Sequence, residues 1–251
     1  MKIIEILING LNVGAIYAMI ALGYTMVYGI AKMLNFAHGD IIMVGGYTLC
    51  VACATMGSPW FIFAAALIAV VICTVLGVVV EKVAYKPLRG ASPLAVLITA
   101  IGVSYLLQSL AQIIFGSAAR RVAVPELGKL TLGGLSIKYS TIITLAVTIV
   151  IMVGLNLFVK YSKTGRAMIA VSEDKGAAQL MGINVNSIIT ITFAIGSALA
   201  ALAGLFYLLQ SPYITNTFGA MPGIKAFTAA VIGGIGSIPG AMVGSLVLGI
   251  I

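Results

Sequence analysis

The chain has 251 residues, of which 61% are hydrophobic and only 8% are charged. Its mean hydropathy is +1.18. A soluble domain of this length needs far more polar surface to cover itself, so the composition excludes a soluble globular protein. We interpret the formal net charge of +8 as loop charge near lipid headgroups, and not as a nucleic-acid-binding surface.

Apolar runs of about 20 residues recur, and each is long enough to cross roughly 30 Å of hydrocarbon as a helix. The first run has no small-residue cleavage site, so we interpret it as a span of the mature protein and not as a signal peptide. The predicted spans cover residues 7–30, 41–56, 60–80, 93–115, 141–159 and 186–209, and a seventh, broken one covers 226–251.

This pattern predicts an all-α, polytopic helical membrane protein with about seven spans. Residues 1–251 are expected to form a single transmembrane domain. The chain stops at Ile251 inside an apolar run without a polar tail, so we expect the C-terminus to be truncated.

Residues 31–40 (A-K-M-L-N-F-A-H-G-D) interrupt the apolar sequence between the first two spans. Asn35, His38, Gly39 and Asp40 continue a lipid-facing helix poorly. A break in hydrocarbon is tolerated only inside protein or beside water. Two interpretations stay open: a discontinuous helix that lines a translocation path, or a simple polar turn. His38 is the only histidine; we favour a capping or packing role for it over proton relay or metal binding.

A second break is predicted at residues 233–240 (G-G-I-G-S-I-P-G), inside the last apolar stretch. A glycine-rich loop can cradle phosphate, but this one has no following Lys-Ser/Thr and lies between apolar runs. We therefore expect a helix break or close packing, and include the segment among the candidates for the translocation path. The residues concerned are Gly233, Gly234, Gly236 and Pro239.

Cys50 and Cys53 form a C-x-x-C pattern, which can indicate redox or metal chemistry. Both lie in a predicted membrane helix with no His or carboxylate near them in sequence. We interpret them as buried structural residues and predict no metal site.

The densest run of charge covers residues 160–185, between the fifth and sixth spans. We predict a short helix within it. Ser172 is a good N-cap, and Glu173 and Asp174 then stand in the first turn, where negative charge favours the helix dipole. Gly182 can end this helix in the left-handed conformation.

The same helix is a candidate docking element. Several of its residues are apolar or small, and three of them fall near one face, which would fit an apolar groove of a partner. An ordinary polar connection between two membrane helices is the alternative. The face residues are Ala177, Leu180 and Met181, and Ala178 and Ile183 complete the candidate set.

The loops after the third and fifth spans must lie on the same side of the membrane. Their excess of Lys and Arg favours an inside location, and hence an outside N-terminus. The cations counted are Lys82, Lys86, Arg89, Lys160, Lys163, Arg166 and Lys175.

Five runs of the sequence together resemble one known family. They are Y-G-I-A-K-M-L-N-F-A-H-G-D, E-K-V-A-Y-K-P-L-R, S-K-T-G-R-A, A-A-x-x-x-G-I-N-V and G-I-K-A-F-T-A-A-V-I-G-G-I-G-S-I-P-G-A. With these runs the chain resembles, over nearly its whole length, the branched-chain amino-acid ABC importer permease of the LivH type. Two departures are visible: Asp40 stands where the family usually has Glu, and the family continues past Ile251 to about eight spans.

The resemblance implies a permease subunit of an ATP-driven importer that moves Leu, Ile or Val across the bacterial inner membrane, with a periplasmic N-terminus. It implies a second homologous permease, two ATP-binding subunits that meet the A-A-x-x-x-G-I run, and a periplasmic substrate-binding protein. The chain has no Walker A motif, so we expect it to be no enzyme and to bind no cofactor itself. ATP and Mg would belong to the partner subunits, and nucleic acid is not an expected partner.

A secondary transporter or channel for a small amino acid or amide, which needs no ATPase, is the alternative function. Ion coupling favours acidic residues within the membrane, and Asp40 is the only good candidate. An intramembrane enzyme ranks third, because no paired catalytic constellation is visible. The sequence does not separate leucine from valine, or amino acids from small amides.

Overall fold

The computed structural model describes residues 2–132 and 135–251, and within them the fold is a helical bundle. Six helical segments are long and apolar enough to cross a membrane. Their main helices are α1 (Lys2–Ala31), α2 (His38–Met56), α3 (Ile62–Val80), α4 (Pro93–Phe115), α5 (Tyr139–Tyr161) and α8 (Val185–Gln210).

Shorter elements connect or extend these helices. The third segment begins with η1 (Pro59–Phe61) and continues through a π-helical turn, η2 (Glu81–Tyr85), into η3 (Lys86–Leu88). The other short helices are α6 (Lys163–Glu173), α7 (Lys175–Leu180), α9 (Ala220–Ile232) and α10 (Ile238–Ile250). Two small antiparallel sheets pair β1 (Arg120–Arg121) with β4 (Tyr213–Ile214), and β2 (Lys129–Leu132) with β3 (Leu135–Lys138).

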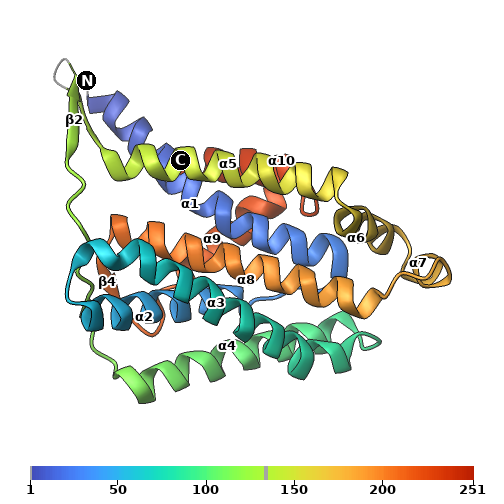
Figure 1. The fold of residues 1–251 in the computed structure, drawn as a ribbon. Helices are drawn as coiled ribbons and strands as arrows, with labels where there is room; N and C mark the ends of the chain where they lie inside the picture. Colours follow the sequence, from blue (N-terminus) through green and yellow to red (C-terminus); the bar gives the residue numbers. More distant parts are fainter. Residues whose placement is uncertain (1, 133–134) are drawn as a thin grey trace.

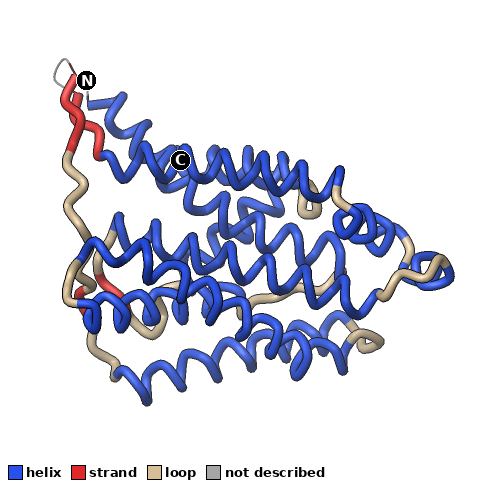
Figure 2. Tube along the Cα trace, in the orientation of Figure 1, coloured by secondary structure: helices blue, strands red, loops and turns tan. Residues whose placement is uncertain are grey.

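The long helices lie side by side, and the two ends of the bundle differ (Figure 1). One end carries the N-terminus and both sheets, and we call it the sheet end; there, the carboxylate of Glu5 accepts a hydrogen bond from the Ser136 N–H. The opposite end carries α6 and α7, and we call it the α6–α7 end. Figure 2 shows that strands occur only at the sheet end within the described residues. The loops after the third and fifth spans lie together at the α6–α7 end, as predicted.

The centre of the bundle is formed by α1 and α8, whose middle residues are almost entirely buried. By contrast, α4 and α5 expose large aliphatic side chains along most of their length. Such exposure is costly in water but favourable in hydrocarbon, so these two helices face lipid or another membrane protein.

Glycine allows α1 and α10 to pack closely, as expected where helices associate without a hydrophobic driving force. A Cβ added at Gly10 would lie 2.7 Å from the Gly249 carbonyl oxygen, and one at Gly14 would lie 2.9 Å from Leu246 Cα. At the other end of α1, Gly29 lies against Gly236. The two helices therefore run antiparallel with their backbones almost in contact.

The span predictions agree closely with the structure for five spans; for 93–115 the bounds coincide with those of α4, whereas α1 begins five residues earlier than predicted. The predicted break in the last stretch is present, and it divides the stretch into two short helices. The chain reverses at residues 233–237, where Gly234 and Gly236 have φ of 90° and 100°, and α10 packs back against α9. Hydropathy averaged over 226–251 does not distinguish a bent helix from two antiparallel ones.

Candidate functional site

The first break returns the chain to the interior of the bundle. After α1 ends at Ala31, residues 32–37 are not helical, and α2 begins at His38. His38 is buried against the middle of α1, because a Cβ added at Gly23 would lie 2.5 Å from its Cε1 atom. Gly23 precedes Ala31 by about 12 Å along a helix of 1.5 Å rise per residue. Helix α2 therefore starts well inside the bundle, and the predicted break near residues 31–40 is confirmed, whereas its role in lining a translocation path stays a prediction.

A second helix starts at the same depth. Residues 211–219 follow α8, and α9 begins at Ala220 beside the start of α2. A Cβ added at Gly39 would lie 2.6 Å from the Gly219 carbonyl oxygen, and one at Gly223 would lie 3.1 Å from Gly39 Cα. Only glycine permits two backbones to approach so closely in this place.

The first N–H groups of both helices have no partner within the helix, as at any helix start; some bond to carbonyls of the preceding turn, and neither start has a side-chain cap. Together with the helix dipoles they produce a positive potential inside the bundle. Discontinuous helices in transporters use such starts to face anionic groups of a substrate.

A cavity of about 290 Å³ lies beside the two helix starts, between α2, α4 and α9. Its volume is near the lower end of the range for small-molecule sites. The α4 wall is open on its outer side, because the Tyr105 side chain is 67% exposed. The lining residues are Tyr24, Phe36, Gly39, Asp40, Ile101, Ser104, Tyr105, Gln108, Ala220, Gly223 and Ile224.

Asp40 is the carboxylate of this cavity. It is buried in the first turn of α2, and its Oδ1 accepts a hydrogen bond of 2.9 Å from Nε2 of Gln108 on α4. The same Gln108 amide group also donates to Ser104 Oγ at 3.2 Å. Asp40 thus connects the start of α2 to α4, an element with which α2 shares few other contacts.

Asn35 and His38 are buried close by, but neither lines the cavity. Asn35 Oδ1 accepts a hydrogen bond of 2.8 Å from Tyr85 Oη. The His38 ring lies 4.7 Å from the ring of Tyr24, centroid to centroid. Both side chains hold the broken segment against its neighbours in this structure.

The second predicted break lies elsewhere. Gly233, Gly234 and Gly236 lie in the α9–α10 turn at the α6–α7 end, and Pro239 lies in the first turn of α10; none of them lines the cavity beside Asp40. Gly236 borders a separate cavity of about 100 Å³ against α6. The prediction of a helix break is confirmed here, whereas the grouping of this segment with Asn35–Asp40 is not supported by the geometry.

Sequence reasoning missed the partners of Asp40. Ser104 and Gln108 are polar residues four apart in the otherwise apolar helix α4, so they share one face. Gly219 and Gly223 have the same spacing around the start of α9. These two patterns are the signals in the sequence that could have indicated the site.

The charged segment forms two helices and not one, so Ser172 is not an N-cap. It lies in the last turn of α6, where its hydroxyl donates to the Ile169 carbonyl at 2.7 Å, and Glu173 is the final residue of that helix. Asp174 caps α7 by accepting from the N–H groups of Gly176 and Ala177 at 2.7 and 3.0 Å. A carboxylate caps more strongly than a hydroxyl when it also meets the positive end of the dipole.

The α7 region presents apolar side chains to the outside. Leu180 and Met181 are 91% and 83% exposed, and Ala177 is exposed beside them. Ala178 is buried on the opposite side and packs in the cluster that contains Ile183. Gly182 has φ of 80°, so it ends the helix in the left-handed conformation as predicted.

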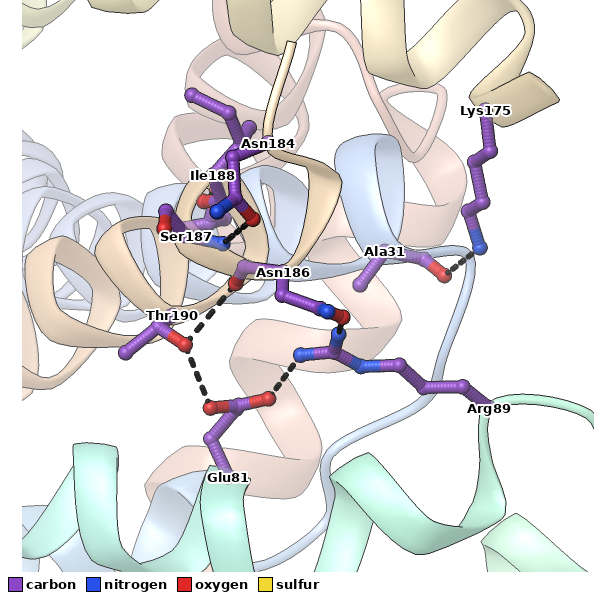
Figure 3. A network of polar contacts seen from close by, with 10 residues as sticks. Ala31, Glu81, Arg89, Lys175, Asn184, Asn186, Ser187, Ile188 and Thr190 are labelled. Carbon is purple, nitrogen blue, oxygen red and sulfur yellow. Dashed lines mark hydrogen bonds and ion pairs between the residues drawn. The ribbon is translucent and has the colours of Figure 1, made fainter. Parts of the chain in front are cut away.

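A polar network joins three segments at the α6–α7 end (Figure 3). Glu81 is fully buried and forms an ion pair with Arg89, which also donates to Asn186 Oδ1. The Thr190 hydroxyl donates to the other Glu81 oxygen at 2.8 Å. A buried charge is stable only when it is paired, so this network joins η2 and η3 to the start of α8.

The three cysteines are free. Cys53 and Cys73 are buried, Cys50 is half-buried, and the Cys73 thiol donates to the Ile41 carbonyl at 3.4 Å. The structure therefore places all three among packed helices.

Comparison with known proteins identifies the family. The model of the family described as branched-chain amino acid transport system / permease component matches residues 6–251. The chain is 45% identical to the high-affinity branched-chain amino acid transport system permease protein BraD of Pseudomonas aeruginosa, over 97% of this chain and 83% of the relative.

Two further relatives carry the name LivH. The Escherichia coli (strain K12) protein is 46% identical, over 96% of this chain and 82% of its own length. The probable branched-chain amino acid transport permease LivH of Methanocaldococcus jannaschii is 26% identical, over 92% and 74%. No solved structure matches. With a family model that matches nearly its whole length, the chain belongs to the family of branched-chain amino acid transport system permease components.

Proposed function

We propose that this chain forms half of the pathway through which an ATP-driven importer moves leucine, isoleucine or valine. The observation that carries the proposal is the cavity beside Asp40, where two helices start inside the bundle. The names of the relatives support the substrate class.

The cavity suits a branched-chain amino acid chemically. Such a molecule has an apolar side chain and a zwitterionic backbone. Phe36, Ile101 and Ile224 supply apolar walls, and the helix starts and Asp40 supply the few polar groups. A path must release its cargo, so weak contacts with few polar groups suit it better than a tight site.

We propose that Asn35, His38 and Asp40 hold the helix starts, and that specificity resides in a periplasmic binding protein. The hydrogen bonds of Asn35 and Asp40 to Tyr85 and Gln108 support a holding role. The open α4 wall supports a second, homologous permease as the other half of the pathway.

The exposed apolar residues of α7 support docking of an ATP-binding subunit at the α6–α7 end. Leu180 and Met181 would enter a groove of that subunit, while Ala178 anchors the helix to the permease. The complex would hold two such subunits in the bacterial inner membrane, with α7 in the cytoplasm and the N-terminus outside. Membership of this family favours an importer over a secondary transporter or channel.

The test is reconstitution. The permease is co-purified with the proteins encoded next to it, and the complex is incorporated into liposomes. Uptake of radiolabelled leucine is then measured in the presence of the binding protein, with ATP placed either inside or outside the liposomes. We expect a stable complex with an ATPase, and uptake that requires both ATP and the binding protein. Uptake by the permease alone, driven by an ion gradient, would support the secondary-transporter alternative instead.

A further inference from the structure

Three basic side chains from three separate segments line one cavity of about 230 Å³ at the α6–α7 end. Lys32 directly follows α1, Arg89 follows η3, and Lys175 begins α7. The three residues are far apart in the sequence, so their arrangement around one space results from the fold and not from a local run of charge.

The backbone is strained at Lys32. Lys32 has φ of 57°, the left-handed region that non-glycine residues rarely adopt, and it is the one such residue among those described. Lys175 Nζ donates to the Ala31 carbonyl at 2.9 Å (Figure 3), which leaves two of its three N–H bonds for another acceptor.

Arg89 is held by other contacts. Its two terminal nitrogens bond to Glu81 and Asn186, but its Nε–H is buried and has no partner in the described part of the chain. This nitrogen is covered by protein in the structure, so Arg89 contributes to the cavity mainly through the charge of its guanidinium group.

The charges around the cavity are not balanced. Glu81 is the carboxylate that contacts Arg89, and neither Lys32 nor Lys175 forms an ion pair with a described carboxylate. Burial, and then the charges of Arg89 and Lys32, lower the pKa of Lys175 from its ordinary value. Like charges brought together in this way attract an anion.

The remaining walls are apolar. Met33, Leu34, Leu88 and Val96 contribute them, and the cavity lies where the candidate spanning helix α1 ends and α4 begins, the level at which lipid headgroups are expected. Basic pockets between membrane helices bind phosphate-bearing headgroups. This position favours an amphipathic anion over a fully hydrated one.

We propose that Lys32, Arg89 and Lys175 form a binding site for a phosphate group, supplied either by the headgroup of an anionic phospholipid or by a soluble phosphate. Because its ligands come from the end of α1 and the start of α7, an occupied site stabilises the contact between these two helices. The site is separate from the cavity beside Asp40 and does not depend on the proposed transport function.

The test uses the purified permease complex in nanodiscs. Native mass spectrometry after release from phosphatidylglycerol nanodiscs measures retained lipid, with phosphatidylcholine as reference. We expect retained phosphatidylglycerol in the native protein, and a loss of at least about fivefold in Lys32→Gln, in line with about 1 kcal/mol for one cation near a headgroup. Lys163→Gln, an exposed cation at the same end that does not line the cavity, is the matched control, and Lys32→Arg should restore retention.

A second arm distinguishes the two sources. Equilibrium dialysis with radiolabelled inorganic phosphate is run on the same proteins in phosphatidylcholine nanodiscs. Saturable phosphate binding that Lys32→Gln weakens, without retained phosphatidylglycerol, identifies a soluble phosphate as the ligand and supports the site. Equal retention and equal phosphate binding in the native, Lys32→Gln and Lys175→Gln proteins overturn the proposal, as does the absence of both ligands from the native protein.

Discussion

Lys175 Nζ donates a hydrogen bond of 2.9 Å to the carbonyl oxygen of Ala31, so the first residue of α7 is bonded to the last residue of α1. From Ala31 the chain continues through residues 32–37 directly to His38, Gly39 and Asp40. A displacement of α7 therefore reaches the helix start beside the cavity through only a few residues. Two arrangements of this connection, each favoured by a different state of the ATPase, would couple the α7 region to the cavity beside Asp40.

Replacement of Lys175 by Met should weaken this coupling. One hydrogen bond from a partly exposed charged group is worth about 1 kcal/mol, so we expect ATP-driven uptake to fall on the order of fivefold while the complex still assembles. The measurement is uptake per ATP hydrolysed in phosphatidylcholine liposomes, which contain no anionic phospholipid, with an enzyme present that consumes the phosphate released by ATP hydrolysis, so that the proposed phosphate site stays empty. Lys163→Met is the control, and equal coupling in both variants would show that the Lys175–Ala31 bond does not transmit motion.

Gly182→Val should uncouple transport and leave ATP binding intact. The φ of 80° at Gly182 is strained for valine by about 1–2 kcal/mol, although a Cβ there would meet no atom within 4 Å. The change therefore acts on the backbone that ends α7 and not on packing. Gly90→Val, at the same end with open space and no positive φ, is the control. Normal transport-coupled hydrolysis in Gly182→Val would count against a role for the α7 end in coupling.

Gly219→Ala should destabilise the whole permease. A Cβ there would overlap the carbonyl oxygen of Gly39, and neither backbone can move without displacing a helix start. Overpacking of this kind costs about 1–3 kcal/mol, so we expect the melting temperature in detergent to fall by about 5 °C or more. Gly102→Ala on α4, where a Cβ meets nothing within 4 Å, should change it little. Similar melting temperatures for the two variants would mean that the α2–α9 contact is looser than described.

Local patterns predicted the elements well, and contacts between distant segments were not predictable. Helix α4 has Ser92 as its N-cap, Pro93 at its first position and Gly116 after its end, so its bounds follow from nearest neighbours alone. The break at residues 32–37 is likewise visible in composition. The bond between Asp40 and Gln108 joins residues 68 positions apart, and no periodicity indicates such a pair.

The errors have physical causes as well. Ser172 and Asp174 are both good caps, and the choice between them depends on where α6 ends, which packing of Met168 and Val171 decides. The reversal at residues 233–237 depends on the antiparallel contact of α10 with α1, another long-range feature. Residue propensities contain neither piece of information.

The orientation of the bundle can be measured directly. With Cys50, Cys53 and Cys73 replaced by Ala, Lys129→Cys reports the sheet end and Lys163→Cys the α6–α7 end; both side chains are exposed. We expect a membrane-impermeant maleimide to label Lys129→Cys in intact cells, and Lys163→Cys only after permeabilisation, because Lys and Arg concentrate inside. The reverse pattern would invert the proposed topology and place α7 out of reach of a cytoplasmic ATPase.

Asp40→Asn tests whether the cavity carboxylate holds the helix start or touches the cargo. The variant keeps a side-chain oxygen that can accept from Gln108 but loses the charge, and charge-assisted bonds exceed neutral ones by about 1 kcal/mol or more. We expect uptake to fall roughly five- to tenfold. The ratio of leucine to valine uptake should stay within about twofold of its value in the native protein. A twofold change in this ratio corresponds to less than about 0.5 kcal/mol of selectivity.

Gln108→Ala should reproduce this effect, since it removes the donor from Asp40 without touching the helix start. Gln112→Ala is the matched control, because Gln112 lies one turn further along α4, bonds to Asn216 and does not line the cavity. His38→Ala should lower uptake in the same way, through lost packing against Gly23 and Tyr24. A normally assembled Asp40→Asn complex with an altered substrate preference would instead show that Asp40 contacts the amino acid directly.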